Sequence, residues 1–415
     1  MKFIVATYGT EGDARPFAAL CRGLMDAGHE AQLLADAATL GSAHALGVPA
    51  TALSGDIRDV FTADRAIAGV VAKGGGFNDT TRALAKIANE NAASWLRAII
   101  EAGEGCDAIV VAGLAAFAGF SAAEYLSIKS IGSGMIPITP TAAFPSPFLP
   151  PKLVPRLLNR ASHRFVNDML WKAFRDKTNA ARTMFKLSPR KKVWTEQPMI
   201  YGVSPTLLPA LGDWPTNVRL CGQWLYGNSG WTPPPALENF LGAGEAPIYI
   251  GFGSMTGFDK ARLLDTLIEA MTDRRALFNP GWSGIDPKEL PDNFLVIGDT
   301  PHDWLFSRTA AVIHHGGSGT SHSAARAGVP SIVIPFAGDQ FFWAERLRVA
   351  GVAPATVDGR RPRAEAVVSA LNFAFSERVK NRARALGEKM RSEKGVVDAV
   401  VALERIAVSM DNLGS

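Results

Sequence analysis

Short apolar runs alternate with amphipathic stretches along the first half of this chain. We expect the apolar runs to form buried strands and the amphipathic stretches to form helices. The predicted strands are Lys2–Thr7, His29–Leu34, Val48–Leu53 and Ala108–Val111. The predicted helices run from about Arg15 to Ala27, over Ala83–Ala102 and through Ala122–Leu126. Such β–α alternation is typical of a parallel, doubly wound sheet.

The same alternation restarts in the second half of the chain. The predicted strands are Ile248–Phe252, Phe294–Ile297, Ala311–Ile313 and Ser331–Pro335. The predicted helices are Lys260–Met271, a short piece from Leu305, and a long helical terminus from about Arg363 to Met410. A stretch rich in Pro, Gly, Trp and Asn, Leu208–Pro235, separates the two halves. Two such halves would enclose a cleft faced by the loops that follow the strands.

The pattern predicts a chain of two domains. The expected parts are an N-terminal domain (1–210), a linker (211–235), a C-terminal domain (236–385) and a C-terminal helix (386–415) that could cross back to the N-terminal domain. At 415 residues the chain is too long for one ordinary domain. Hydrophobic residues make up 47% of it, which is enough to fill two cores.

Cysteine usage and the N-terminus indicate a cytoplasmic protein. The three cysteines are far apart and form no CxxC pair, so we expect free thiols in a reducing compartment. The chain opens directly on a strand-like run, MKFIVATYGT, without the pattern of a signal peptide. No apolar run is long enough for a transmembrane helix.

Residues 151–192 form a basic block with 12 Lys and Arg against 2 Asp and Glu, in a chain whose net charge is only +4. Apolar residues are interleaved with these charges, so the block could rest on an anionic membrane surface, peripheral to the inner face. The alternative, which the pattern favours, is a solvated helix face with its apolar side packed inward. We expect no binding of nucleic acid, because no recognised nucleic-acid module accompanies the block.

The segment 311–341 combines features that suit a phosphorylated sugar. An apolar strand leads into two histidines, a glycine-rich turn and a short helix, and a second strand ends in an acid–amide pair. Backbone N–H groups at a helix start attract phosphate, and glycines let the backbone approach it closely. The acid–amide pair could bind the hydroxyl groups of a sugar. The segment therefore predicts a diphosphate site beside a sugar site.

The motif HHGGSGTSHSAARAGVPSIVIPFAGDQFFWAERLRVAGV resembles the donor-binding signature of family 1 glycosyltransferases with the GT-B fold. It is most similar to the bacterial and fungal branch that acts on sterols, macrolides and other lipophilic acceptors. Two further segments, LPDNFLVIGDTPHDWLF and TYGTEGDARP, match the same branch. The resemblance implies an α/β GT-B fold, with two Rossmann-like doubly wound domains facing a cleft. It also implies an inverting, metal-independent glycosyltransferase that moves a hexose from a nucleotide diphosphate sugar to a hydroxyl of a lipophilic acceptor.

The resemblance assigns the donor diphosphate to a set of residues around the glycine-rich turn. These are Ser254, His315, Gly317, Ser318, Gly319 and Thr320. For the turn itself, the alternative is an ordinary helix start capped by Ser318 or Thr320. Ser254, in the loop GFGSM, could equally belong to a plain turn. His314 is expected to face away, and Trp282 either lies near the nucleotide base or is packed in the core.

The resemblance also assigns the donor sugar and the catalytic base. Asp339 and Gln340 match the sugar-binding pair, although Asp339 could instead cap the helix that follows. Asp13 is the expected general base, because an inverting transfer needs one group to take the proton of the acceptor hydroxyl. Its alternative role is an N-cap of the first helix. Glu11 is a weaker competitor for the base.

Several absences narrow the chemistry. No D-x-D occurs, so we expect neither a bridging metal nor another cofactor. No G-x-G-x-x-G follows the first strand, which argues against a nicotinamide-dependent dehydrogenase. The acid that holds the ribose hydroxyls in plant members is replaced by Ser323, so UDP-glucose is the first expectation for the donor and a dTDP sugar remains open. A catalytically silent homologue that binds nucleotide or activates a partner, and a nucleotide-sugar epimerase, are the rival functions.

Overall fold

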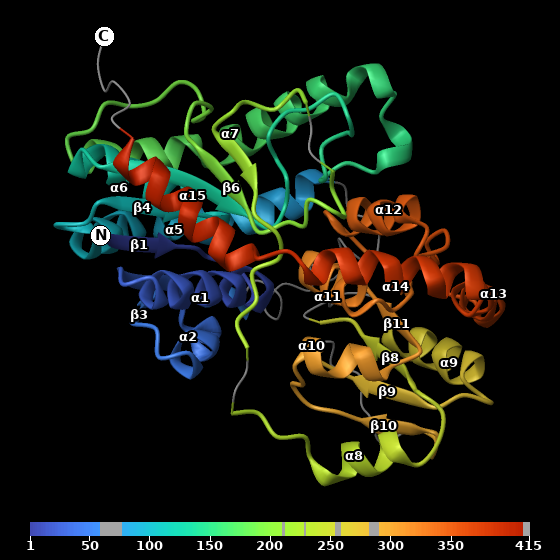
Figure 1. Ribbon diagram of the computed structural model, residues 1–415. Helices are drawn as coiled ribbons and strands as arrows, with labels where there is room; N and C mark the ends of the chain where they lie inside the picture. Colours follow the sequence, from blue (N-terminus) through green and yellow to red (C-terminus); the bar gives the residue numbers. More distant parts are fainter. Residues whose placement is uncertain (59–76, 210–211, 228–229, 254–258, 282–289, 410–415) are drawn as a thin grey trace.

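The chain folds into two α/β halves in this computed structural model, which describes residues 1–58, 77–209, 212–227, 230–253, 259–281 and 290–409 (Figure 1). One half carries a seven-stranded sheet and the other a five-stranded sheet. All recorded strand pairs are parallel. The fold class expected from the β–α alternation is therefore confirmed.

The N-terminal sheet has the strand order β3-β2-β1-β4-β5-β6-β7. Its strands are β1 (Lys2–Ala6), β2 (Glu30–Asp36), β3 (Ala50–Leu53), β4 (Ala108–Val111), β5 (Lys129–Gly134), β6 (Met199–Tyr201) and β7 (Val218–Leu220). Its helices are α1 (Glu11–Asp26), α2 (Gly41–Ala45), α5 (Phe77–Gly103), α6 (Ala116–Leu126) and α7 (Asn159–Met184). β4 is buried throughout, as helices on both faces of a parallel sheet require.

The C-terminal sheet has the strand order β10-β9-β8-β11-β12. Its strands are β8 (Ile248–Gly251), β9 (Ala276–Asn279), β10 (Phe294–Val296), β11 (Ala311–His314) and β12 (Ser331–Val333). The helices of this half are α8 (Pro235–Gly242), α9 (Lys260–Ala270), α10 (His302–Leu305), α11 (Ser318–Ala327), α12 (Gln340–Ala350), α13 (Ala364–Ala374) and α14 (Glu377–Arg391). β8 and β11 are central and wholly buried, so the loops after them open at the middle of the sheet edge.

The last helix, α15 (Gly395–Val408), returns from the C-terminal half and packs on α1 (Figure 1). Two glycines permit this close crossing. A Cβ on Gly395 would lie 2.1 Å from the Gln223 carbonyl oxygen, and a Cβ on Gly23 would lie 2.1 Å from Val396 Cγ1. Val400 and Leu403 of α15 then join the core of the N-terminal half.

The structure differs from the sequence prediction at several places, among them the strands β5, β6 and β9, which were not predicted. The first helix begins at Glu11 rather than near Arg15, because Thr10 and Asp13 form a capping box at its start. β7 lies inside the stretch expected to be a linker and pairs with β6. The terminal helix predicted as continuous is divided into α13, α14 and α15, and extended backbone at Ser376 interrupts it after α13.

Candidate functional site

The glycine-rich turn after β11 brings the chain sharply from the strand into α11. His314 ends the strand, is fully buried, and accepts a hydrogen bond from the Gly316 N–H at 3.1 Å through Nδ1. Gly316 has φ +95°, a conformation that favours glycine. A Cβ there would also lie 2.8 Å from Val333 Cγ1, so the turn requires this residue. His314 thus stabilises the turn through this hydrogen bond, and the side chain of the next residue, His315, points in another direction.

Glycines surround the imidazole of His315. A Cβ on Gly317 would lie 2.5 Å from His315 Nε2, and one on Gly253 would lie 3.2 Å from Cε1. Nδ1 is buried without a hydrogen-bond partner in the described part of the chain. Burial lowers the pKa of His315 to about 4, so its imidazole is neutral near pH 7. A neutral ring with an unsatisfied nitrogen can form a hydrogen bond to a ligand in this pocket of small residues.

The start of α11 is not capped by a side chain. Gly317 occupies the N-cap position, and no side-chain cap hydrogen bond forms there. Capping by Ser318 or Thr320, the alternative left open by the sequence, is therefore not observed. The Ser318 hydroxyl instead donates to the Met135 carbonyl of the other half at 2.9 Å. Gly319 is exposed, and the N–H groups of this first turn lie at the positive end of the helix dipole.

Asp13 is the third residue of α1 and faces the N-cap residue. Its Oδ2 accepts hydrogen bonds from the Thr10 N–H at 2.9 Å and from the Thr10 hydroxyl at 3.3 Å. The proposed N-cap role therefore belongs to Thr10, and Asp13 completes the capping box. Burial raises the pKa of the Asp13 carboxyl, and the hydrogen bonds from Thr10 oppose that shift. Glu11, the competing acid, turns to the Ser42 hydroxyl at 3.2 Å and to Arg15.

Asp339 and Gln340 lie at the start of α12. The Asp339 carboxyl does not cap this helix; it accepts a hydrogen bond from the Trp343 indole N–H at 2.9 Å. Gln340 Oε1 accepts from the backbone N–H groups of Phe336 at 2.7 Å and Ala337 at 3.1 Å. Gln340 therefore holds the loop between β12 and α12, and its amide oxygen is already satisfied by backbone donors.

The charge of Asp13 in one half of the chain acts on the carboxyl of Asp339 in the other half. Burial raises the pKa of Asp339 to about 7, and the charge of Asp13 raises it further while the Trp343 hydrogen bond lowers it. Such an effect requires that α1 and the start of α12 lie close together. Asp13 therefore lies within electrostatic range of Asp339, although the two residues are distant in the sequence.

Direct contacts bind the two halves around this site. They are Arg15 Nη2 to Asp299 Oδ2 at 3.0 Å, Ser318 to the Met135 carbonyl, and the Ser204 N–H to His322 Nε2 at 3.2 Å. Gln223, from the segment between the halves, also donates to the hydroxyl of Ser323 at 3.0 Å. Ser323, which replaces the acid of plant members, is buried.

Two predicted site residues, Ser254 and Trp282, lie outside the described residues. Two contacts that the sequence analysis missed have recognisable signals. Trp343 follows Asp339 at the i+4 spacing that puts two side chains on one helix face. Thr10 and Asp13 have the spacing of a capping box.

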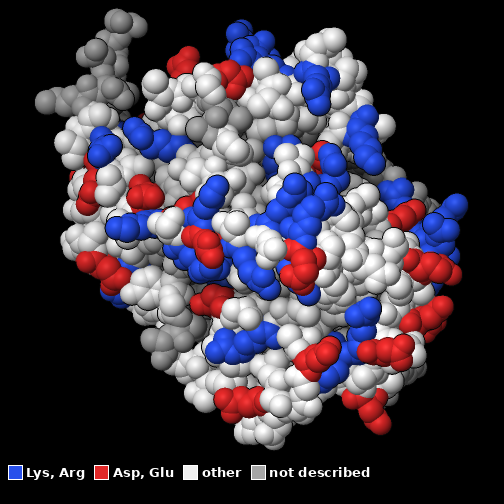
Figure 2. All heavy atoms as spheres, turned by 45° about the vertical axis from the view of Figure 1, so that its right-hand side comes forward, with Lys and Arg blue, Asp and Glu red and all other residues white. Residues whose placement is uncertain are grey.

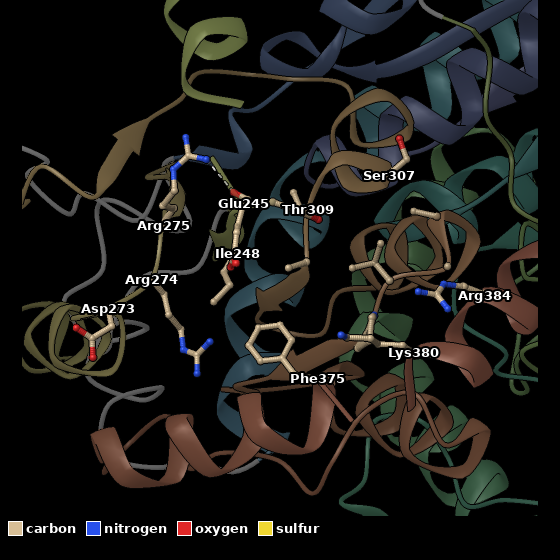
Figure 3. Close-up of a pocket in the computed structure, with 16 residues that line it drawn as sticks. Glu245, Ile248, Asp273, Arg274, Arg275, Ser307, Thr309, Phe375, Lys380 and Arg384 are labelled. Carbon is tan, nitrogen blue, oxygen red and sulfur yellow. Dashed lines mark hydrogen bonds between the residues drawn. The ribbon is translucent and has the colours of Figure 1, made fainter. Parts of the chain in front are cut away.

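A hollow of about 800 Å³ elsewhere in the C-terminal half does not belong to this site (Figure 3). Its lining includes Ile248, Arg275, Ala310 and Pro330, at or just before the first residues of β8, β9, β11 and β12. The hollow therefore lies at the amino edge of the sheet, whereas His315 follows the carboxyl end of β11. Among the described residues, no group of three or more His, Cys, Asp or Glu could hold a metal ion. No helix in the described ranges is both long and apolar enough to cross a bilayer.

Comparisons with known proteins relate the whole chain to glycosyltransferases. The erythromycin biosynthesis protein CIII-like C-terminal domain family matches residues 270–398. The chain is 33% identical over 428 residues to O-mycaminosyltylonolide 6-deoxyallosyltransferase of Streptomyces fradiae, with 98% of each chain covered. It is 31% identical over 422 residues to sterol 3-beta-glucosyltransferase UGT80A2 of Arabidopsis thaliana. The aligned region covers 97% of this chain and 65% of that protein. The match to a sterol 3-beta-glucosyltransferase of Neurospora crassa covers only 27% of the length of that protein.

Solved structures agree on the architecture. The glycotransferase of kitacinnamycin superposes with a TM-score of 0.71 at 18% identity, covering 97% of this chain and 98% of the other. The glycosyltransferase VinC, solved in complex with dTDP, gives a TM-score of 0.68 at 17% identity, covering 98% and 99%. At these identities the likeness shows the shared GT-B fold.

Proposed function

The chain belongs to the family 1 glycosyltransferases, and from this membership we propose that it moves a hexose from a nucleotide diphosphate sugar to a hydroxyl of a lipophilic acceptor. Two observations support the proposal: the start of α11 beside His315 is uncapped and lined by glycines, and the charge of Asp13 in the other half acts on Asp339 at the start of α12. Helix-start N–H groups suit the diphosphate, and a carboxylate suits the acceptor proton.

The proposed reaction inverts the anomeric carbon in one displacement. The acceptor oxygen forms a bond to that carbon while the bond to the diphosphate oxygen breaks, and the electron pair leaves with the nucleoside diphosphate. The acceptor proton goes to the Asp13 carboxylate. Developing charge on the leaving diphosphate is stabilised by His315 and by the N–H groups of Ser318, Gly319 and Thr320. Because Gly317 has no side chain, the backbone there can lie close to the phosphates.

The remaining donor contacts follow the family signature. Asp339 and Gln340 are proposed to hold the sugar hydroxyls, Ser254 to contact the diphosphate and Trp282 to lie near the base. UDP-glucose is the first candidate, because several sterol relatives are named glucosyltransferases. A dTDP sugar is the second, because the structural neighbour VinC was solved with dTDP. No metal or other cofactor is needed in this scheme.

The acceptor is proposed to be a sterol, terpenoid, polyketide or lipid-like alcohol. The relatives named for sterols and for a tylonolide derivative support this class. We also propose peripheral contact with a membrane through the block 151–192, on the inner face of a cytoplasmic membrane, because that block carries a local excess of ten positive charges.

Nucleotide binding and turnover test the proposal in two steps. First, UDP and dTDP are compared for the rise in melting temperature that they give the full chain, since a ligand that binds only the folded state stabilises it. Second, release of nucleoside diphosphate from UDP-glucose is measured with a detergent-dispersed sterol and without acceptor. The transferase proposal expects release that depends on acceptor. Release without acceptor would instead favour the epimerase rival.

The variant Asp13→Asn removes the proposed base while keeping an oxygen that can accept the hydrogen bond from Thr10. Asn can still accept the Thr10 N–H, so we expect nucleotide affinity to stay within about twofold while kcat falls by roughly 10²- to 10⁴-fold. Glu11→Gln is the matched control on the same helix turn, and it should change kcat by far less. If Asp13→Asn turns over as fast as the parent protein, Asp13 is not the base. If the parent chain binds nucleotide but turns over no acceptor, the silent-homologue alternative gains support.

A further inference from the structure

Large apolar side chains stand exposed on two short 3-10 turns and on the helix that follows them. The turns are η3 (Pro151–Leu153) and η4 (Arg156–Leu158). Leu153 is 76% exposed, Leu157 is 86% exposed, and Phe165 on α7 is 57% exposed. Single exposed leucines are common on soluble proteins, but a cluster within fifteen residues marks an interaction surface.

Cations alternate with these apolar side chains. Lys152, Arg156 and Arg164 are exposed, and each is without an ion pair or side-chain hydrogen bond within the described residues. Figure 2 shows Lys and Arg side chains, together with a few Asp and Glu side chains, among uncharged surface across the upper part of the molecule. We call the surface of Lys152, Leu153, Arg156, Leu157, Arg164 and Phe165 the leucine–arginine surface.

The later part of the basic block is different. The side chain of Arg182 is only 3% exposed and bonds to Glu124 at 2.7 Å. Arg190 pairs with the same carboxylate and lies 4.3 Å from the centre of the Trp194 ring. These arginines hold α7 and the following loop on α6. The packed-helix alternative therefore describes Arg182 and Arg190, whereas the first part of the block has three exposed apolar side chains beside cations that no such contact holds.

The leucine–arginine surface adjoins the candidate site. η3 contacts α12, the helix that begins at Gln340. Just before η3 in the chain, the Phe144 ring lies 5.0 Å from the Phe342 ring of α12. The next residue, Trp343, donates its indole N–H to Asp339. The surface is thus linked through α12 to the residue that holds Asp339.

We propose that the leucine–arginine surface docks on an anionic lipid bilayer, with its leucines inserted among the acyl chains, and that the acceptor enters the cleft from that bilayer. Cations beside inserted apolar groups are the pattern of interfacial membrane segments. A second copy of the chain is a poorer occupant, because an isologous contact would bring the same unpaired cations together. The route of the acceptor rests on the proposed function, whereas the docking does not.

Vesicle co-sedimentation of the full chain tests the docking. The probes are phosphatidylcholine vesicles with and without phosphatidylserine. We expect binding that requires phosphatidylserine, weakens with salt, and falls at least about tenfold in Leu153→Ser/Leu157→Ser. Val397→Ser/Val401→Ser on α15 removes other exposed apolar groups and should leave binding unchanged. Lys152→Glu/Arg156→Glu should abolish binding, whereas Lys191→Glu/Lys192→Glu, in the later part of the block, should not.

Three results would overturn the docking: no binding of the parent chain to either vesicle, equal losses in both charge-reversal pairs, or a change of oligomeric state in the leucine pair without a change in vesicle binding. Turnover then tests the acceptor route. The leucine pair should lose turnover of a sterol embedded in vesicles and keep turnover of a detergent-dispersed sterol. Vesicle binding without any turnover would overturn the proposed function alone, and turnover in detergent without vesicle binding would overturn the docking alone.

Discussion

Asp339 should destabilise the folded chain when it ionises. Its pKa in the folded structure is raised to about 7, mainly by burial and further by the charge of Asp13. The unfolded chain has no such burial, and its carboxyl ionises near 3.8. Replacement by Asn removes the ionisation and keeps an oxygen that can accept the Trp343 N–H. We therefore expect Asp339→Asn to be more stable than the parent chain at neutral and alkaline pH.

The sign follows from proton binding. Between pH 3.8 and about 7 the folded chain holds a proton on Asp339 that the unfolded chain has lost, so this group makes stability fall as pH rises. The difference of about three pKa units corresponds to about 4 kcal/mol, which is an upper bound because relaxation around the charge reduces it. The advantage of the variant should be small near pH 4, grow towards pH 7 and then level off.

Melting temperatures of parent and variant between about pH 4 and about pH 8 give the assay. Asp273→Asn, an exposed residue in the turn before β9, is the matched control and should show no such trend. Asp13→Asn should reproduce part of the effect, since it removes a charge that acts on Asp339, and the double variant should gain less than the sum. A constant difference between Asp339→Asn and the parent across the whole pH range would refute the reasoning.

Three further predictions concern the surroundings of the site. Gly317→Ala places a Cβ 2.5 Å from His315 Nε2, so we expect calorimetric affinity for nucleoside diphosphate to fall at least about tenfold while the far-ultraviolet circular dichroism spectrum is unchanged. Thr10→Ala removes the N-cap hydroxyl of α1 and should lower the free energy of unfolding, measured with urea, by about 1 kcal/mol. Arg15 and Asp299 are exposed, so a double-mutant cycle should give a coupling of less than about 1 kcal/mol that salt weakens.

The hydrophobic pattern predicted the architecture because most strands are buried on both faces and most helices are amphipathic. It missed β5, β6, β7 and β9. Strands of three residues, such as Met199–Tyr201 (β6), are too short to show a period. β7 also lies in a stretch rich in Pro and Gly, and its pairing with β6 depends on the rest of the sheet. The terminal helix is divided at Ser376 by a local change to extended backbone within a continuous amphipathic pattern.

The order of elements around the candidate site follows from the sequence, whereas only part of its hydrogen bonding does. The strand–glycine–helix order around His315 follows from local sequence, and α11 begins where that order indicates. The partner of Ser318 comes from tertiary packing, because the carbonyl of Met135 is more than 180 residues away, whereas Asp339 bonds to Trp343 in its own helix. The effect of Asp13 on the pKa of Asp339 depends on how the two halves face each other, and no local pattern encodes it.

Burial favours the neutral forms of the titratable side chains in both halves of the candidate site. It lowers the pKa of His314 and His315 and raises the pKa of Asp13 and Asp339. A diphosphate entering this site would therefore meet a neutral imidazole and the oriented N–H groups of α11. Those groups stabilise negative charge through fixed dipoles, which need no reorganisation as charge develops. Gly317 lets the backbone approach the phosphates and leaves space for the imidazole of His315. Its substitution should therefore weaken nucleotide binding more than neutralisation of the Asp13 or the Asp339 carboxyl.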